Sequence, residues 1–271
     1  MILAINVGNT NVTVGCIDRK QTYFIERIST QLNKTELEYA ISLKNIMELY
    51  QISPEHIEGG IVSSVVPPLS EIIRQSAIKI IQKDVRLVGP GVKNGLNIQI
   101  DNPAQLGSNM VVNAVGAMES YPLPIIIIDM GTATSISVIN QKGCYAGGVI
   151  IPGLNSALDY LAVRTSQLPK ISLEAPEHTI GKNTVACMQS GAVYGTASML
   201  DGMIERMEEE LGSPATVVST GKIARFISPY CRHKILYDDT LMLKGLLSIY
   251  EKNSGRCSHS EKSAAQKGEG K

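Results

Sequence analysis

Residues 4–10 read Ala-Ile-Asn-Val-Gly-Asn-Thr, and residues 127–134 read Ile-Ile-Asp-Met-Gly-Thr-Ala-Thr. In each copy an apolar strand leads through an amide or acidic residue into a turn built on Gly and Thr, and a second strand rich in β-formers follows. Glycine lets the backbone approach an anion closely, and the N–H and hydroxyl groups of such a turn can point at a phosphate. The repeat therefore predicts two phosphate-binding β-hairpins, one in each half of the chain.

The two copies differ at one position that matters for chemistry. Position 129 is Asp, whereas the matching position 6 is Asn. An amide keeps the shape of a carboxylate but carries no charge. The sequence thus indicates the framework of a phosphotransferase and leaves open whether its chemistry is intact.

Strand patterns recur along both halves, with helical patterns between them. The expected strands are 2–6, 11–17, 22–28, 59–66, 85–88, 125–130, 134–140, 144–151 and 215–219, and the expected helices are 35–50, 68–82, 102–119, 188–211 and 240–250. Each half reads as a β-meander followed by alternating helices and strands. This order predicts an α/β protein of two similar domains around a central cleft, produced by internal duplication.

The domain boundary is expected near the Tyr-Pro-Leu-Pro run at 121–124. We therefore assign 1–120 to an N-terminal domain and 121–252 to a C-terminal domain. The tail at 253–271 is Lys, Ser, Gly and Glu with few apolar residues, a composition typical of disorder.

The clearest helical pattern is 35–50. Thr35 and Glu38 have the spacing of a capping box, the side-chain pair that closes the first turn of a helix. We expect its apolar face to consist of Leu37, Ala40, Ile41, Met47 and Tyr50.

Composition excludes several classes of function. Of 271 residues 44% are hydrophobic, and 25 Lys plus Arg balance 25 Asp plus Glu, so we expect neither nucleic-acid nor membrane binding. No apolar run reaches the ~18 residues of a membrane helix, and no basic segment precedes the first strand, so no signal peptide is expected. The five cysteines lack Cys-x-x-Cys spacing and the four histidines lack metal-ligand spacing, which favours a reducing cytoplasm and argues against a zinc site.

Four further blocks accompany the two turns in a fixed order. The six blocks are 7–11, 89–96, 101–115 (Asp-Asn-Pro, Leu-Gly and Asn-Ala-Val), 129–134, 147–153 and 180–191 (Ile-Gly-Lys-Asn-Thr and Gln-Ser-Gly). With them the chain resembles the type III pantothenate kinases, which belong to the superfamily of acetate and sugar kinases, heat-shock ATPases and actin. The resemblance covers roughly residues 1–250.

This resemblance implies two actin-like, ribonuclease H-like domains. It implies transfer of the ATP γ-phosphoryl group to pantothenate, giving 4′-phosphopantothenate in the first step of coenzyme A biosynthesis. It also implies a cytoplasmic homodimer that uses Mg²⁺ and a monovalent cation, K⁺ or NH₄⁺.

The resemblance assigns roles position by position. Asp129 matches the ligand of the monovalent cation. The ATP and phosphate positions are Asn6, Val7, Gly8, Asn9, Thr10, Asn11, Thr13, Gly131 and Thr132. The substrate positions are Ile100, Gly107, Ser108, Asn109, Met110 and Thr184. Taken singly, each glycine could form an ordinary tight turn, and Asp129 could cap the turn at a strand end. The occurrence of the motif in both halves favours a phosphate and cation site instead.

The substrate loop departs from the family pattern. Residues 107–110 read Gly-Ser-Asn-Met where the family reads Gly-Ala-Asp-Arg. The family Asp is the general base, and Asn109 has no basic lone pair; losing a positioned base typically costs about 10² to 10⁴ in rate. Met110 replaces the substrate-holding Arg with an uncharged side chain, and Ile100 replaces a Tyr. Amides also replace carboxylates at Asn6 and Gln105.

Three hypotheses remain open at this stage. The first is a pantothenate kinase whose activity is weak or lost. The second is a non-catalytic pseudoenzyme, which either binds a ligand or regulates an active paralogue by forming a heteromer with it. The third is a kinase for a different hydroxyl acceptor, because Ile100 and Met110 make the pocket more apolar. Asp101 could replace the missing base, although its place in the Asp-Asn-Pro block favours a structural role.

Overall fold

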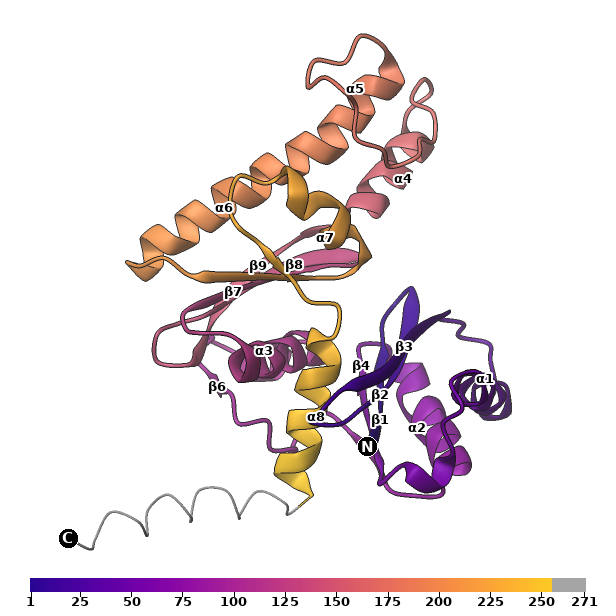
Figure 1. Cartoon of the computed structure of the whole chain (residues 1–271). Helices are drawn as coiled ribbons and strands as arrows, with labels where there is room; N and C mark the ends of the chain where they lie inside the picture. Colours follow the sequence, from indigo (N-terminus) through magenta and orange to yellow (C-terminus); the bar gives the residue numbers. More distant parts are fainter. Residues whose placement is uncertain (255–271) are drawn as a thin grey trace, which may run out of the picture. The chain divides into compact units, whose positions relative to one another are not determined.

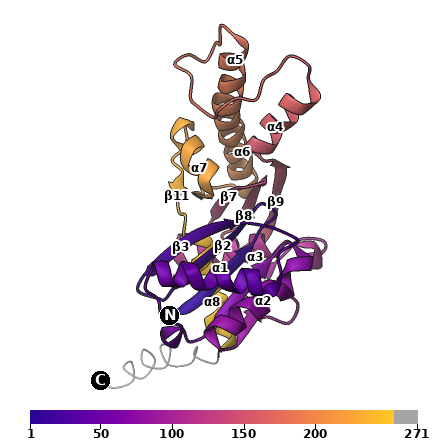
Figure 2. The same cartoon turned by 90° about the vertical axis from the view of Figure 1, so that its right-hand side faces the viewer.

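The computed structural model describes residues 1–254, which form two compact units (Figures 1 and 2). Unit 1 comprises Met1–Leu96, Ala104–Glu119 and the described residues from Thr240 onward, and unit 2 comprises Asn97–Pro103 and Ser120–Asp239. Across these 254 described positions, no helix is long and apolar enough to cross a membrane.

Unit 1 is built on a five-stranded sheet. The strands are β1 (Ile2–Val7), β2 (Asn11–Ile17), β3 (Thr22–Ser29), β4 (Gly60–Ser64) and β5 (Val85–Leu87), in the order β3-β2-β1-β4-β5. The first three form an antiparallel meander, and β4 and β5 run parallel to β1. The helices are α1 (Glu36–Leu49), α2 (Pro67–Ile81), α3 (Ser108–Ser120) and α8 (Leu241–Asn253), with a 3-10 turn at Pro54–His56.

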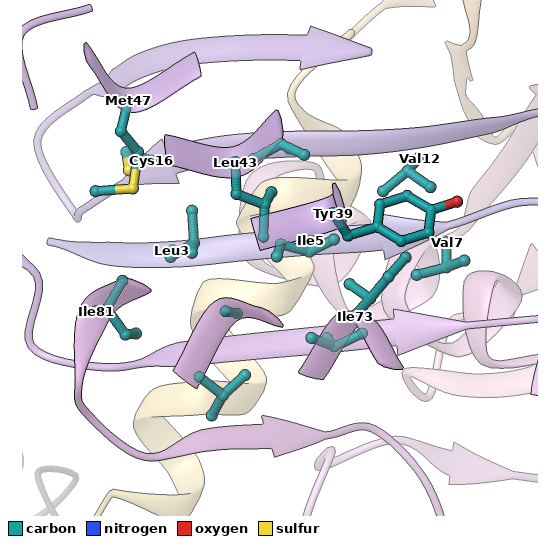
Figure 3. Packing of buried hydrophobic residues seen from close by; sticks show 14 of the residues in the cluster. Leu3, Ile5, Val7, Val12, Cys16, Tyr39, Leu43, Met47, Ile73 and Ile81 are labelled. Atoms are coloured by element: carbon teal, nitrogen blue, oxygen red, sulfur yellow. The ribbon is translucent and has the colours of Figure 1, made fainter. Parts of the chain in front are cut away.

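Strand β1 is buried on both faces, which explains its continuous apolar sequence. Leu3, Ile5 and Val7 pack against α1 and α2 in the cluster that Figure 3 shows. Ile2 and Ala4 point to the opposite face, where α3 and α8 cover the sheet. Because side chains alternate along a strand, Asn6 belongs to this second face.

Unit 2 repeats the topology of unit 1. Its sheet order is β11-β10-β7-β8-β9-β6, formed by β7 (Ile125–Met130), β8 (Ala133–Ile139), β9 (Cys144–Pro152), β10 (Thr216–Thr220), β11 (Leu236–Tyr237) and β6 (Asn97–Ile98). Strands β7, β8 and β9 form an antiparallel meander, and β10 and β11 run parallel to β7. Its helices are α4 (Leu154–Arg164), α5 (Thr184–Ser190), α6 (Thr196–Leu211) and α7 (Lys222–Ile227). The expected α/β repeat is confirmed, with β6 as the one strand added to the second copy.

Helix α1 confirms one local prediction and corrects another. The capping box forms, since Glu38 N–H donates to the Thr35 hydroxyl and the Thr35 N–H donates to the Glu38 carboxylate. The predicted apolar face is wrong in part, because Leu37, Ile41 and Tyr50 are 58%, 50% and 38% exposed. The buried residues are Tyr39, Ala40, Leu43 and Met47, which face α2 and the sheet.

Two helix predictions needed revision. The Asn-Pro at 102–103 opens only a 3-10 turn, Pro103–Gln105, and α3 begins at Ser108 because its first helical bonds run to the Gly107 carbonyl. The long helix expected at 188–211 starts earlier, at Thr184, and contains a π-helical turn at Gly191–Gly195 between α5 and α6. The short elements α4, α7, β6 and β11 were not predicted.

Helix α8 belongs with unit 1, whereas the sequence placed 121–252 together in a C-terminal domain. Leu243, Leu246 and Ile249 fill the second face of the unit 1 sheet with residues of α3. The expected disordered tail at 253–271 lies outside the described residues, except for Asn253, which ends α8, and Ser254.

Candidate functional site

The first Gly-Thr turn, Gly8–Thr10, connects β1 to β2 and is called the Gly8 turn below. Gly8 N–H donates to the Asn11 carbonyl at 3.0 Å and closes the hairpin. Thr30, directly after β3, holds the turn from behind: its hydroxyl donates to the Gly8 carbonyl at 2.7 Å, and its N–H donates to the Thr10 carbonyl at 2.9 Å. These bonds fix the turn in position, while Asn9 and Thr10 remain exposed.

A buried polar layer lies next to the Gly8 turn. Asn6 sits opposite Thr13 of β2 and Ser63 of β4, so the three side chains share one face of the sheet. Asn6 is 8% exposed and Ser63 is fully buried. Among the residues from 1 to 254, neither Asn6 Oδ1 nor Ser63 Oγ has a hydrogen-bond partner. Because buried polar atoms rarely stay unpaired, this layer is suited to an ordered water or a ligand.

The substrate loop of the sequence prediction lies at the same end of unit 1. Ser108 at the start of α3 donates from its hydroxyl to the Ser64 carbonyl at 2.9 Å, and Val65 N–H donates to the Val7 carbonyl at 3.0 Å. The segment after β4 thus joins the loop at 107–110 to the end of β1. Asn109 Oδ1, like Asn6 Oδ1, is buried with no partner in the described part of the chain.

The second Gly-Thr turn, Gly131–Thr132, connects β7 to β8 and is called the Gly131 turn. Gly131 N–H donates to the Ala133 carbonyl at 3.0 Å. The Thr132 carbonyl accepts from the Gly153 N–H at 3.2 Å and from the Ser156 hydroxyl at 3.0 Å. A Cβ on Gly153 would lie 2.4 Å from the Thr132 carbonyl oxygen, so only glycine permits this contact.

Asp129 in unit 2 has the position that Asn6 has in unit 1. It sits opposite Ser135 of β8 and Thr220 of β10, just as Asn6 sits opposite Thr13 and Ser63. A carboxylate flanked by hydroxyl residues offers oxygen ligands, which hard cations prefer. Gly221 follows Thr220 with a φ of +94°, and a Cβ there would lie 2.6 Å from the Met130 carbonyl oxygen.

The structure distributes the remaining predicted residues over unit 2. Ile100 is half-buried after β6, and Thr184 is the exposed first residue of α5. Asn183 caps this helix by accepting from the Ala186 N–H at 2.9 Å. The Gln189 side-chain amide donates to the Ser172 carbonyl at 3.3 Å, which fixes α5 to the preceding loop. Asn183 is thus the N-cap of α5, and Lys182 directly precedes it.

Ser137 is a buried residue of β8. Its hydroxyl lies 3.0 Å from the Tyr145 hydroxyl inside unit 2. Burial raises the pKa of Tyr145, and the Ser137 hydrogen bond opposes this shift. Ser137 therefore belongs to a buried neutral hydroxyl pair.

Sequence reasoning missed the residues that hold the two turns and the loop at 107–110 in place. Thr30, Ser64 and Ser156 lie outside every motif. Thr30 and Ser156 donate hydroxyl hydrogen bonds to the turns, and the Ser64 carbonyl accepts one from Ser108. A Ser or Thr just after a strand is a weak signal, because its partner is known only once the strand register is known.

Comparison with known proteins identifies the family. A family model described as type III pantothenate kinase matches residues 2–206. Type III pantothenate kinases of Exiguobacterium sp. and Halalkalibacterium halodurans are 42% and 40% identical over 93% of this chain, and the matches cover 99% and 100% of those proteins. A crystal structure of a putative Baf family transcriptional activator from Campylobacter jejuni matches 93% of this chain and 98% of its own with a TM-score of 0.56 at 18% identity, which supports the fold alone. Two units of matching topology, each with a glycine turn after its first strand, thus occur in a chain that belongs to the type III pantothenate kinase family.

Proposed function

We propose that this chain transfers the γ-phosphoryl group of ATP to the terminal hydroxyl of pantothenate, forming 4′-phosphopantothenate, with a low turnover number. One observation carries the proposal: the glycine turn recurs after the first strand of both sheets, in a chain about 40% identical to curated type III pantothenate kinases over nearly its full length. Transfer of a phosphoryl group depends mainly on positioning and on charge neutralisation, and fixed backbone turns suit this task.

The Gly8 and Gly131 turns would bind the ATP phosphates. Thr10, Asn11, Thr13 and Thr132 would add side-chain hydrogen bonds at these turns. Within the turns, the carbonyls of Gly8, Thr10 and Thr132 accept hydrogen bonds from the protein, so these negative ends of the peptide groups are already occupied. N–H and hydroxyl donors are what an anion requires.

The donor atoms fit Mg²⁺ that arrives with the nucleotide. No group of three His, Cys, Asp or Glu side chains that could hold a metal occurs within residues 1–254. Mg²⁺ usually needs only one or two protein ligands besides phosphate oxygens, and Asn6 and Thr13 would offer neutral oxygens. When bound, the ion would neutralise charge on the transferred group. Asp129 would hold the monovalent cation, K⁺ or NH₄⁺.

Pantothenate would be positioned by the loop at 107–110, with Ile100 and Thr184 as further contacts. Asn109 Oδ1 can accept a hydrogen bond from the substrate hydroxyl but cannot take its proton near neutral pH. In a loose transition state the proton leaves late, so positioning without a base still permits slow transfer. This is why we expect a low turnover number and not complete inactivity.

A homodimer would cover the exposed apolar residues of unit 2. Ile150 of β9, Val163 of α4 and Ile180 before α5 are 68%, 80% and 82% exposed. Dimerisation buries apolar surface of this kind. The free cysteines Cys16, Cys144, Cys187 and Cys231 favour a reducing compartment such as the cytoplasm.

The decisive experiment measures 4′-phosphopantothenate formation with saturating ATP, Mg²⁺ and K⁺. The unmodified chain is compared with an Asn109→Asp/Met110→Arg double variant, which restores the family pattern. Slow turnover by the unmodified chain and faster turnover by the variant are expected. Turnover by the variant alone would show a kinase framework that is silenced at this loop, and the absence of turnover by both would overturn the proposal.

A second candidate is a ligand-binding protein without catalysis, which regulates an active paralogue or forms a heteromer with it. Neutral amides at both Asn6 and Asn109, whose buried oxygens have no hydrogen-bond partner among residues 1–254, favour this alternative. It predicts nucleotide or pantothenate binding by calorimetry with no product. A kinase for another acceptor would instead consume ATP with a different hydroxyl compound.

A further inference from the structure

Both Gly-Thr turns are held by a backbone N–H that follows the third strand of the meander and by a nearby hydroxyl. In unit 1, Thr30 follows Ser29, the last residue of β3, and its N–H donates to the Thr10 carbonyl at 2.9 Å. In unit 2, Gly153 follows Pro152, the last residue of β9, and its N–H donates to the Thr132 carbonyl at 3.2 Å. In each unit the donor therefore comes from the residue after the third strand of the meander.

A hydroxyl completes the arrangement in both units. The Thr30 hydroxyl donates to the Gly8 carbonyl at 2.7 Å. The Ser156 hydroxyl, in the first turn of α4, donates to the Thr132 carbonyl at 3.0 Å. The two units differ in detail: in unit 1 the Gly8 and Thr10 carbonyls accept one bond each, whereas in unit 2 the Thr132 carbonyl accepts both. In both units the donors are one backbone N–H and one hydroxyl.

These bonds determine which end of each peptide dipole a ligand meets. A carbonyl oxygen carries partial negative charge and repels a phosphate, whereas an N–H attracts it. A carbonyl that accepts one or two hydrogen bonds from the protein is held in place, and its peptide plane cannot rotate the oxygen toward the ligand. In a trans peptide group the N–H points away from the carbonyl, so a fixed Gly8 carbonyl also fixes the Asn9 N–H, and a fixed Thr132 carbonyl fixes the Ala133 N–H. These N–H groups keep their direction before an anion arrives, which lowers the ordering cost of binding.

We propose that Thr30 and Ser156 are positioning residues for phosphate: their hydroxyls fix the Gly8 and Thr132 carbonyls and thereby direct the N–H groups of Asn9 and Ala133 toward the nucleotide. The inference rests on the proposed function, since it takes the phosphate chain of a nucleoside triphosphate as the ligand. It adds two residues that touch the turns and not the reacting atoms.

The test for unit 1 compares Thr30→Val with Thr30→Ser. Val keeps the shape and the N–H but removes the hydroxyl, and Ser restores it. Binding of the non-hydrolysable analogue AMP-PNP with Mg²⁺ is measured by calorimetry. Because one such hydrogen bond is expected to change affinity about three- to tenfold, Thr30→Val should weaken binding by that factor and Thr30→Ser should bind like the unmodified chain.

Thr22→Val is the matched control, since Thr22 lies at the other end of the same strand β3. Unfolding temperatures are recorded without ligand for all variants. A purely structural role would lower the unfolding temperature of Thr30→Val and leave its affinity for AMP-PNP unchanged. The inference requires an affinity loss that Thr22→Val does not share and that Thr30→Ser restores.

The test for unit 2 compares Ser156→Ala with Ser156→Thr, and its exposed neighbour in Asn155→Ala is the control. The same three- to tenfold loss is expected for Ser156→Ala alone. Normal affinity in both Thr30→Val and Ser156→Ala would overturn the inference and leave the proposed function standing. Failure of the unmodified chain to bind AMP-PNP would overturn the nucleotide site itself and the inference with it.

Discussion

Asn6 is the residue at which the two halves of the chain diverge chemically. Its amide lies in the buried layer between Thr13 and Ser63, whose side chains carry hydroxyls and no charge. Asn6→Asp should therefore lower the unfolding temperature without ligand, because an unpaired charge is buried. Mg²⁺ with ATP would supply the missing partner, so the variant should recover its stability when both are bound. Compared with the unmodified chain, it should need about tenfold less Mg²⁺ to reach half of the maximal rise in unfolding temperature.

The check is thermal unfolding of Asn6→Asp over a Mg²⁺ series at fixed AMP-PNP. Asn113→Asp is the matched control, because Asn113 is a buried amide of α3 in the same unit. It should be destabilised alike but gain nothing from Mg²⁺ and the nucleotide. Equal rescue of both variants would contradict a metal-facing role for position 6.

A second prediction at the residue scale concerns Asp201, which is buried on α6. Burial alone would raise the pKa of its carboxyl, but the N–H groups of Arg232 and His233 and the His233 ring outweigh burial and hold the pKa below its usual value. A depressed pKa contributes stability above the unfolded-state pKa of about 3.9, and this contribution disappears as the pH falls through the folded-state pKa.

Asp201→Asn should therefore cost about 2–3 kcal/mol at pH 7, since hydrogen bonds to a charged group are lost. The cost should shrink as the pH falls below about 4. Denaturant unfolding of both proteins at pH 7 and near pH 3 tests this. A difference in stability that stays constant with pH would show that the ionised form of Asp201 plays no part.

At the scale of secondary-structure elements, the crossing of α3 and α8 depends on glycine. A Cβ on Gly245 would lie 1.9 Å from the Val112 carbonyl oxygen, which is a backbone atom that cannot move aside. Gly245→Ala should destabilise unit 1 by about 1–3 kcal/mol or more by forcing the helices apart. Gly191→Ala is the control: it is a helical glycine whose added Cβ would meet nothing within 4 Å, and it should be neutral or stabilising.

Urea unfolding followed by circular dichroism gives both free energies. Because α3 carries Ser108 and Asn109 at its start, Gly245→Ala should also weaken pantothenate binding. Equal stability of the two variants would show that the backbones can separate without cost.

The same elements show what the sequence could reveal. Strands β1, β2, β7 and β8 were predicted to within one residue, because apolar runs bounded by glycine turns leave little choice. Helix α4 was missed because only Leu154 of its eleven residues is buried, so no apolar period marks it. The positions of the two glycine turns followed from the repeat, whereas the hydrogen bonds of Thr30 and Ser156 to these turns depend on strand register and could not be predicted.

At the scale of the whole molecule, the order of elements along the chain does not match the two units. Unit 1 is assembled from three separate stretches of sequence, and its last stretch is α8. An internal duplication read from the sequence naturally assigns each half of the chain to one domain. Helix α8 breaks this rule because its apolar residues complete a face of the first sheet, a fact that only the packing reveals.

The chain should therefore tolerate shortening only up to the end of α8. Truncation after Asp239 removes Leu243, Leu246 and Ile249 and exposes Ile2, Ala4 and Ile61 on the second face of the unit 1 sheet. Burying a side chain of Leu or Ile contributes about 1.5–3 kcal/mol, and three such losses are comparable to the whole stability of a domain, about 5–15 kcal/mol. We expect this truncated chain to aggregate or to lose cooperative unfolding of unit 1.

Truncation after Ser254 is the matched control, because it keeps α8 and its packing against the second face of the unit 1 sheet. It should leave the unfolding temperature unchanged to within about 2 °C, a shift that corresponds to less than about 1 kcal/mol for a protein of this size. Calorimetry of the two truncated chains beside the full chain decides the matter. A cooperative native transition after removal of α8 would mean that α3 alone can cover the second face of the sheet, and α8 would then be a peripheral addition to unit 1.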